Sequence, residues 1–359
     1  MIILQSYSCK NCGAELFWNP KTNSLKCEFC DNEYQPSDFQ DNTLNKNQKN
    51  EELQAEYTMA GQDLADGMVV YACKNCGGEV VTSKTTMATS CAFCGEAISI
   101  TSKSAGNFRP EILIPFSINK KDAQKKYKDY VSSSFLTPKE FKEANKIEKM
   151  QGLYVPYWLH SMDTAVDSVM ECEVVTSRRS GDDKIETHKV YHVYVDADGR
   201  YTNVPTDASK KLDDKLMDSL EPFRYEKLNQ FNPAFMAGFY SEQPDTTKEE
   251  TLPRAQERVR SSMQEKITAT VNTTGNYNNK KFISFNQRYG NIRCNYAMLP
   301  IWLLNVKHKD KNYTFSINGD TGKAVGKLPM SISKLLLVAG GTALATQVAM
   351  MILRIIGIL

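Results

Sequence analysis

The sequence predicts an α+β protein with two zinc ribbons at the N-terminus, a central antiparallel α+β domain and one transmembrane helix at the C-terminus. Three observations support this prediction: a cysteine motif that occurs twice, a central region that alternates between strand-like and helix-like segments, and an uncharged apolar run near the end. The chain of 359 residues has room for two or three domains. We expect ribbons at 1–35 and 67–102, a linker at 36–66, the α+β domain at 107–330 and the transmembrane helix at 334–359.

The repeated motif reads YSCKNCGAELFWNPKTNSLKCEFC at 7–30 and YACKNCGGEVVTSKTTMATSCAFC at 71–94. Each copy is C-x2-C, fourteen residues and C-x2-C, and all eight cysteines recur at an offset of 64. So small a module buries too little apolar surface to fold unaided, and four thiolates around one Zn²⁺ supply the missing free energy. We therefore predict two structural Zn²⁺ ions. Their ligands are Cys9, Cys12, Cys27 and Cys30 in the first ribbon, and Cys73, Cys76, Cys91 and Cys94 in the second.

The residues after the knuckle cysteines fit this geometry. Gly13, Gly77 and Gly95 each follow a knuckle, and Asp31 takes the fourth such position. Glycine, and to a lesser degree aspartate, adopts the left-handed conformation that turns backbone amides toward sulfur. Because cysteine would fill all four tetrahedral positions, the sites are expected to be structural and not catalytic.

Disulfide bonds are the alternative use of these cysteines. They need an oxidising compartment, but residues 1–12 lack the basic segment and long apolar core of a secretory signal. We therefore expect reduced cysteines and bound zinc. Cys172 and Cys294 lie outside the motif and are expected to be buried structural thiols.

Residues 36–66 are rich in Asn, Gln, Asp and Lys. This composition predicts a linker, with room for a short helix near 51–59, so the ribbons are expected to be independent beads. The α+β domain should begin with a strand near 109–118 and a helix capped by Asn119. A second helix is predicted to start at Thr137 and Pro138.

The rest of the domain is expected to contain a hairpin that turns at RRSGDD, residues 178–183, followed by two helices. The first helix starts near Thr206, places Leu212, Leu216 and Leu220 on one face, and ends at Pro222. The second lies within 246–271, where Pro253 is expected to mark its start. DADG at 196–199 resembles a calcium loop, but the later ligands are missing, so a turn is favoured.

Two short motifs echo each other: VPYWL at 155–159 and LPIWL at 299–303. Both lead into a predicted hairpin, which indicates a pseudo-duplicated antiparallel sheet. Trp158 and Trp302 are expected to pack in its core, in preference to contacting a ligand. His188 and His192 should share one face of a strand, which favours a half-exposed strand face over a metal pair.

The run 335–353 contains nineteen uncharged residues and would span about 28 Å as a helix. A buried or amphipathic helix of a soluble domain is the alternative. Residues 305–334 hold six lysines and two aspartates, and beyond the run only Arg354 is charged. This positive-inside bias places the N-terminal bulk in the cytoplasm, with a single pass through the cell membrane. Gly341, Ala345 and Ala349 form a small-xxx-small stripe, which leaves open both self-association and pairing with another membrane protein.

The motifs and the charge of the sequence argue against two classes of function, enzymes and nucleic-acid-binding proteins. No P-loop, G-x-S-x-G or H-E-x-x-H motif is present, so we do not expect an enzyme. Residues 7–34 hold three lysines against four carboxylates, a net charge of −1, and residues 71–98 hold two of each, a net charge of zero. Because phosphate binding needs a clustered basic face, nucleic acid is a disfavoured partner.

The two ribbons, GLYVPYWL at 152–159, VPTDASKKLDDKLMDSLEPF at 204–223 and the single membrane helix together resemble a family of bacterial membrane proteins found mainly in Gram-positive species. The ribbons of this family are of the transcription-factor-IIB and primosomal-helicase type. The resemblance spans most of the chain. The block 204–223 is more distinctive of this family than the ribbons, which occur in many proteins. It implies an association with phage-shock-type envelope-stress operons, in which an SPFH (flotillin-like) protein or a membrane co-scaffold assembles at the membrane. It implies no catalytic residue.

The leading hypothesis is therefore a membrane-anchored adaptor or scaffold that holds two structural Zn²⁺ ions and recruits protein partners to the cytoplasmic face of the bilayer. A membrane-tethered nucleic-acid-binding or transcription-related protein is the alternative. An enzyme within the α+β domain is a third hypothesis.

Overall fold

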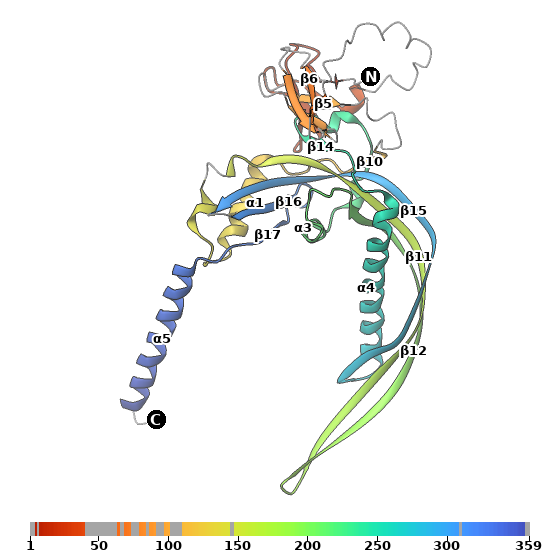
Figure 1. Cartoon of the computed structure of the whole chain (residues 1–359), viewed down its shortest axis with the longest axis vertical. Helices are drawn as coiled ribbons and strands as arrows, with labels where there is room; N and C mark the ends of the chain where they lie inside the picture. Colours follow the sequence, from red (N-terminus) through yellow and green to blue (C-terminus); the bar gives the residue numbers. More distant parts are fainter. Residues whose placement is uncertain are drawn as a thin grey trace.

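The structure is a computed structural model of the chain, and it describes residues 7–39, 110–143, 147–308 and 311–355. It also describes the backbone of short strands at 4–5, 63–64, 68–72, 79–83, 86–90 and 97–100. The four cysteines of the second ribbon, the helix expected near 51–59 and most of the predicted linker lie outside the described residues. Within them the fold is mixed α+β and mostly sheet (Figure 1).

The described residues of the N-terminal third form short strands and one 3₁₀ turn. The first ribbon is a three-stranded antiparallel sheet in the order β2-β3-β4. Its elements, with the strand that precedes it, are β1 (Leu4–Gln5), β2 (Leu16–Asn19), β3 (Ser24–Cys27), β4 (Glu33–Tyr34) and the 3₁₀ turn η1 (Pro36–Phe39). The next strands are β5 (Asp63–Leu64), β6 (Met68–Ala72), β7 (Glu79–Ser83), β8 (Thr86–Ser90) and β9 (Ala97–Ile100).

The central domain is built on three very long strands that form one curved antiparallel sheet. The elements from here to the C-terminus are β10 (Ile112–Leu113), α1 (Lys120–Ser132), η5 (Lys139–Lys142), β11 (Gln151–Ser180), β12 (Asp183–Asp207), α3 (Asp214–Ser219), η6 (Tyr225–Lys227), β13 (Asn229–Gln230), η7 (Pro233–Met236), β14 (Tyr240–Glu242), α4 (Lys248–Thr274), β15 (Asn279–His308), β16 (Lys311–Asn318), β17 (Ala324–Gly326) and α5 (Ile332–Ile355). β11 lies between β12 and β15 and pairs with both in antiparallel register.

The sheet divides into a body and an arm. In the body, β11 and β15 are joined by β10, β13, β14, β16 and β17. In the arm, which we define as 161–201 with 277–293 and α4, β12 replaces these strands as the neighbour of β11. A strand of 30 residues extends about 100 Å at ~3.3 Å per residue. The arm therefore projects far from the body, and α4 lies along its concave face (Figure 1).

The arm is held together by a regular apolar stripe on α4. The buried positions of α4 recur every four residues: Thr251, Ala255, Val259, Met263, Ile267 and Val271. They pack against alternate side chains of β11, such as Val166 and Met170. Because a period of four exceeds 3.6, the stripe winds slowly around the helix, and we infer that this follows the twist of the sheet. Beyond Glu173, where β15 begins its pairing at Asn279, β11 and β12 continue alone to the turn at Gly181.

The body has a core on each face of the sheet. One face holds a large aromatic cluster that includes Trp158, Trp302, Phe116 and Tyr127, and it is covered by α1. The other face holds a smaller cluster around Tyr157 and the residues of α3. The VPYWL and LPIWL motifs lie opposite each other, since Val155 pairs with Leu299. Trp158 and Trp302 are 7% and 5% exposed, so their predicted role in packing is confirmed.

One helix prediction was right, and another was right in kind but wrong about where the helix starts. Asn119 caps α1 as expected, by accepting a hydrogen bond from the Asp122 amide. The long charged helix does not begin at Pro253 but at Lys248, because Thr247 and Glu250 form a reciprocal capping box. Pro253 is accommodated in the second turn of α4.

Two other predictions of local structure were wrong, and a third is only partly described. The helix expected after Pro138 begins with the 3₁₀ turn η5, residues 144–146 lie outside the described residues, and Ile147 is helical. The helix expected from Thr206 is reduced to α3, because Thr206 and Asp207 belong to β12 and Asp213 is the actual cap. DADG at 196–199 is not a turn but part of β12. In the last two cases, pairing with the long β11 overrides the local preference.

The distinctive block 204–223 holds α4 against the body. Arg254 of α4 contacts Asp207 at 2.8 Å and Asp218 at 2.6 Å, and Arg258 contacts Glu221 at 2.5 Å. Asp207 is almost fully buried, and this burial raises its pKa although Arg254 opposes the effect. The aspartates of this block are thus structural partners of the two arginines.

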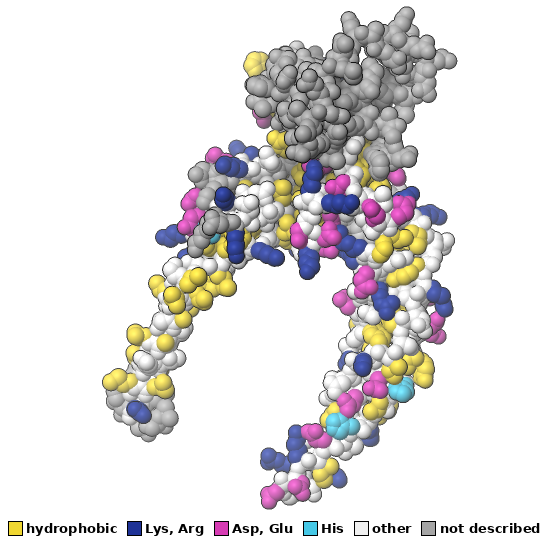
Figure 2. Space-filling view, viewed as in Figure 1, with side chains coloured by type: hydrophobic (Ala, Val, Ile, Leu, Met, Phe, Trp, Pro, Cys, Tyr) yellow, Lys and Arg dark blue, Asp and Glu magenta, His cyan; other side chains and the backbone are white. Residues whose placement is uncertain are grey.

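The apolar helix α5 lies at the C-terminal end of the described residues. Ile332–Met351 is long and apolar enough to span a membrane, and none of it is buried in the structure. Apolar side chains cover the helix (Figure 2). At its base the Ser331 amide donates to the Leu136 carbonyl at 2.8 Å, and Lys334 Nζ donates to the Phe135 and Thr137 carbonyls at 3.0 and 2.6 Å.

An ion pair between a buried aspartate and a partly exposed arginine joins the β16–β17 turn to η6 and provides a test of the fold. The Asp320 side chain is fully buried, contacts Arg224 Nη2 at 2.5 Å, and accepts hydrogen bonds from the Arg224 amide at 2.9 Å and Ser117 Oγ at 3.0 Å. Burial opposes ionisation, but the hydrogen bonds from Arg224 and Ser117 outweigh it and lower the pKa of Asp320.

We predict that Asp320→Ala lowers the free energy of unfolding by about 2 kcal/mol, since it removes the acceptor of the hydrogen bonds from Arg224 and Ser117, while the Arg224 side chain is 42% exposed and is hydrated when it loses its partner. The exposed Lys184–Glu186 pair is the matched control, and Lys184→Ala should cost under about 1 kcal/mol. Urea unfolding in detergent micelles measures both. A carboxyl group whose pKa is lowered by folding stabilises the folded state fully only at pH values above its ordinary pKa. The difference in free energy of unfolding between wild type and Asp320→Asn should therefore shrink as the pH falls below ~4. A constant difference from pH 7 to pH 3 would contradict the assigned role.

Candidate metal centre

The first ribbon brings its four predicted ligands together. Cys9 and Cys12 precede β2, Cys27 ends β3, and Cys30 lies in the turn between β3 and β4. Antiparallel pairing of β2 with β3 places Leu16 opposite Cys27, which closes the two knuckles on each other. Leu16 and Leu25 are fully buried beneath the site. The strands therefore supply the scaffold on which two loops carry the thiols.

Both knuckles have the same backbone turn. The Gly13 amide donates to the Cys9 carbonyl at 2.9 Å, and the Asp31 amide donates to the Cys27 carbonyl at 3.0 Å. Gly13 and Asp31 have φ angles of 75° and 57°, which confirms the predicted left-handed conformation at both positions. The structure does not describe Gly77 and Gly95, so the corresponding prediction for the second ribbon stays open.

The sulfur atoms are spaced as a tetrahedral metal site requires. All four Sγ atoms lie within 4.8 Å of one another, and neighbouring pairs are separated by 3.4 to 3.5 Å. A tetrahedron with Zn–S bonds of ~2.3 Å has S···S edges of ~3.8 Å. Four thiols at these distances match the donor set and geometry of structural zinc, so the residues fit the ion. Within the part of the chain that the structure describes, this is the one such cluster of Cys, His, Asp or Glu side chains.

Hydrogen bonds to sulfur favour the thiolate form at Cys9 and Cys27, whereas at Cys12 the hydrogen bond from the Ala14 backbone is outweighed by burial and the neighbouring sulfur atoms, which raise the pKa to about 12. Burial alone would raise the pKa of Cys9, but the Tyr34 hydroxyl and the amides of Cys12 and Asn11 lower it to about 6. The amides of Cys30 and Phe29 likewise lower the pKa of Cys27. Such N–H···S contacts stabilise the negative charge that four thiolates would bring to one Zn²⁺.

One contact of the site could not be predicted from the sequence. Tyr34 Oη lies 3.3 Å from Cys9 Sγ, and a lone tyrosine four residues after the motif gave no signal of this. The lysines near the site have other partners: Lys26 pairs with Asp31 at 2.9 Å, and Lys10 donates to the Asp38 carbonyl at 3.0 Å.

The first ribbon packs against the body, which corrects the expectation that it is independent of the rest of the chain. Trp18 of β2 enters the aromatic core of the body, and its Nε1 donates to the Phe116 carbonyl at 3.0 Å. The Trp18 ring also packs edge-on against Phe235, with centroids 4.9 Å apart. Asn232 Nδ2 donates to the Pro36 carbonyl at 3.0 Å on the same side of the ribbon. The ribbon and the body thus share one core.

The described strands around the second ribbon continue the same sheet. β8 pairs with β14 of the body, β9 pairs with β8, and β1 pairs with β9. The backbone preceding the first ribbon is therefore linked through β9 and β8 to the central sheet. The placement of Cys73, Cys76, Cys91 and Cys94 is not described, so the second metal site remains a prediction.

The histidines and the remaining cysteines form no further metal site among the described residues. His188 and His192 share the convex face of the arm, as predicted, and contact Glu173 at 2.5 Å and Glu171 at 3.8 Å. His160 is buried, and this burial lowers its pKa to about 4. Cys172 is fully buried in the arm, and Cys294 packs at the edge of the body core.

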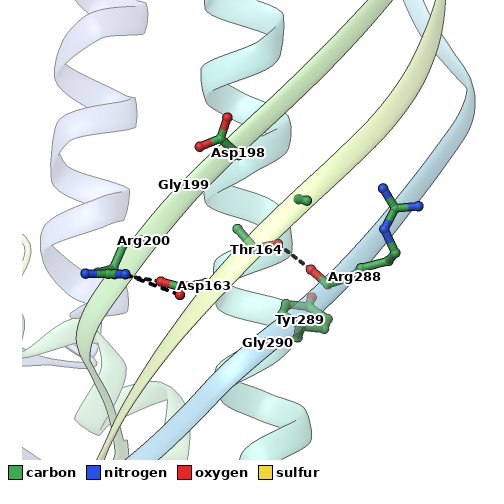
Figure 3. Close-up of a pocket in the computed structure, with 9 residues that line it drawn as sticks. Asp163, Thr164, Asp198, Gly199, Arg200, Arg288, Tyr289 and Gly290 are labelled. Atoms are coloured by element: carbon green, nitrogen blue, oxygen red, sulfur yellow. Dashed lines mark hydrogen bonds and ion pairs between the residues drawn. The ribbon is translucent and has the colours of Figure 1, made fainter.

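A shallow depression of about 590 Å³ lies on the arm, where small residues sit between charged ones (Figure 3). Asp163 is its best-placed carboxylate. Hydrogen bonds from Arg200 Nε at 2.6 Å and Asn291 Nδ2 at 2.7 Å lower the pKa of Asp163. This aspartate is thus held ionised by its neighbours, and the arrangement resembles a surface ion pair more than a general acid or base.

Comparison with known proteins identifies a relative of nearly the same length. The chain is 32% identical over 348 residues to a protein of Bacillus subtilis (strain 168) described as uncharacterized protein YdjG. The match covers 95% of this chain and 96% of that protein. No protein-family model matches the chain, and no solved structure matches it.

The assignment of the metal ligands predicts a specific loss of zinc. Cys12→Ser should lower the zinc content of the protein, purified under reducing conditions, by one equivalent, because three thiolates and an alcohol bind Zn²⁺ far less tightly than four thiolates. Elemental analysis measures this, and Cys172→Ser, a buried thiol outside the cluster, is the control. A Cys12→Ser protein with the zinc content of wild type would contradict the assignment.

Proposed function

The chain belongs to the same family as YdjG of Bacillus subtilis, and we propose that it is a membrane-anchored adaptor that holds a protein partner at the cytoplasmic face of the bilayer. One observation carries this proposal. A ribbon that fits structural zinc is fixed to one side of the body, and a helix long enough to span a membrane leaves another side (Figure 1).

Each part of the molecule fits a binding role. The four cysteines fill every position of the first metal site, so the site has no open coordination position for a substrate. In the arm depression, the carboxylate of Asp163 accepts hydrogen bonds from Arg200 and Asn291. We propose that the second cysteine set, whose spacing repeats the first, binds another structural Zn²⁺, and that neither ribbon takes part in catalysis.

The proposed partner follows from the family resemblance of the sequence. We propose that the partner is an SPFH-like protein or a membrane co-scaffold, and that the assembly acts in the envelope-stress response. The near-neutral charge of both ribbons supports a protein partner over nucleic acid. Gly341, Ala345 and Ala349 lie on α5 and are proposed as the contact surface for a second membrane helix.

The arm restricts how α5 can enter a bilayer. The arm and α5 extend in the same direction from the body (Figure 1). Charged side chains of the convex face, such as Asp167 and Glu171, and the unpaired edges of the arm strands cannot be accommodated in hydrocarbon. We propose that α5 turns away from the arm at 327–331 when it inserts, with loss of the Ser331–Leu136 hydrogen bond.

This placement predicts different surroundings for two exposed positions. Leu344→Trp, in the middle of α5, should show emission that is quenched by lipids brominated near the bilayer centre. Tyr194→Trp, on the convex face of the arm, should not. Fluorescence in reconstituted vesicles, with the wild-type emission of the three native tryptophans subtracted, measures both. Quenching at position 194, or its absence at 344, would refute the arrangement.

The adaptor function predicts that α5 localises the partner as well as the chain. The partner is first identified by crosslinking in intact membranes. A chain that ends at residue 330 should then be found in the soluble fraction, still bound to its partner, because the apolar span of α5 is not buried against the body. Replacing α5 with an unrelated apolar span should restore membrane recovery of both. If the partner stays at the membrane without α5, the chain is not its anchor.

A further inference from the structure

The second knuckle of the first ribbon carries the most exposed large apolar side chain of the described residues. Phe29, between the ligands Cys27 and Cys30, is 83% exposed. A single exposed apolar residue is common in soluble proteins and needs no explanation by itself. Here the same residue recurs in the repeat, because the second ribbon has Phe93 between Cys91 and Cys94. The residue beside it changes from Glu28 to Ala92, but phenylalanine is present in both knuckles.

Phe29 has no role in the core of the ribbon or in the metal site beyond its backbone. The apolar core beneath the cysteines is formed by Tyr7, Leu16 and Leu25 together with Ala234 and Ala237 of the body. The Phe29 amide contacts Cys27 Sγ, which fixes the backbone and directs the ring outward. The side chain is therefore available to a partner.

The knuckle is presented rigidly. The Asp31–Cys27 backbone hydrogen bond closes the turn on one side of Phe29, and Trp18 fastens the ribbon to the body. An aromatic side chain on a fixed turn loses little conformational entropy when it binds. Aromatic residues in such positions commonly supply most of the binding energy at protein interfaces.

The charges around Phe29 indicate the kind of partner. Residues 26–33 hold one lysine and three carboxylates, a net charge of −2, and Lys26 is engaged by Asp31. Acidic surroundings repel phosphate groups, which disfavours nucleic acid and anionic lipid. The remaining occupant is a protein with an apolar pocket and a basic rim.

We propose that Phe29 is the anchor side chain through which the first ribbon binds its protein partner, with Glu28 pairing with basic residues of that partner. Phe93 would have the same role in the second ribbon. This inference rests on the proposed adaptor function, and it specifies the contact that the adaptor uses.

The test uses the full-length chain in intact membranes. A photoreactive phenylalanine analogue at position 29 should crosslink to the same partner that is released from the membrane with the chain ending at 330. Phe29→Ser should lower recovery of that partner at least about tenfold, and Glu28→Lys should lower it less. Tyr194→Ser is the matched control, since Tyr194 is 76% exposed on the arm, and it should leave recovery unchanged.

Zinc content and the emission of Trp18 show whether the ribbon stays folded. Both should be unchanged in Phe29→Ser, because the side chain packs in no core. Recovery within twofold of wild type in Phe29→Ser and in the Phe29→Ser, Phe93→Ser double variant would overturn the proposal while leaving the adaptor function intact. Crosslinks from position 29 that reach only lipid or nucleic acid would also overturn it. Failure of the truncation at residue 330 to release any partner would instead overturn the adaptor function.

Discussion

The antiparallel pairing of β11 with β15 is the interaction on which the rest of the structure depends. It runs from Gln151 opposite Leu303 to Glu173 opposite Asn279, so the same two strands form the body at one end and the arm at the other. The residues that they pair are far apart in the chain, and closing such long loops is entropically costly. The cost is offset in the body, where Trp158, Trp302 and their neighbours form a dense aromatic core. The arm is then an extension of strands already fixed in register.

Several ion pairs in this protein connect elements whose relative orientation hydrophobic packing alone would not fix. Arg254 and Arg258 tie α4 to 204–223, and Arg224 with Asp320 ties η6 to the β16–β17 turn. Buried ion pairs contribute little net stability, but they penalise alternative packings in which one partner is left unpaired. Their concentration at the junction of arm and body is consistent with a fixed angle between the two.

The first ribbon is also stabilised by its contact with the body. So small a module buries little apolar surface of its own, and Trp18 extends this surface by packing into the aromatic core of the body. The consequence is that the knuckles with the four cysteines are held on a rigid support, and α5 leaves the body elsewhere. This separation supports the proposed adaptor function, because binding at one place would not obstruct anchoring at the other.

The sequence by itself determined the features that depend on local chemistry. Cysteine spacing identified Cys9, Cys12, Cys27 and Cys30, the residues after each knuckle identified its turn, and nineteen uncharged residues identified α5. These signals are short-range, so no knowledge of distant contacts was needed. The alternation along β11 and the turn near Gly181 were also readable, although not the length of the strands.

Only the tertiary structure decided where these parts meet. Trp18 looked like an ordinary ribbon residue, yet it is buried among residues of the body, including Phe235, more than two hundred positions away. The sequence DADG at 196–199 predicts a turn, and Thr206 is a typical helix cap. Both segments are strand in the structure, because they pair with β11. Side-chain burial and long-range strand pairing outweigh local propensities of about 1 kcal/mol or less, and neither can be read from a short window of sequence.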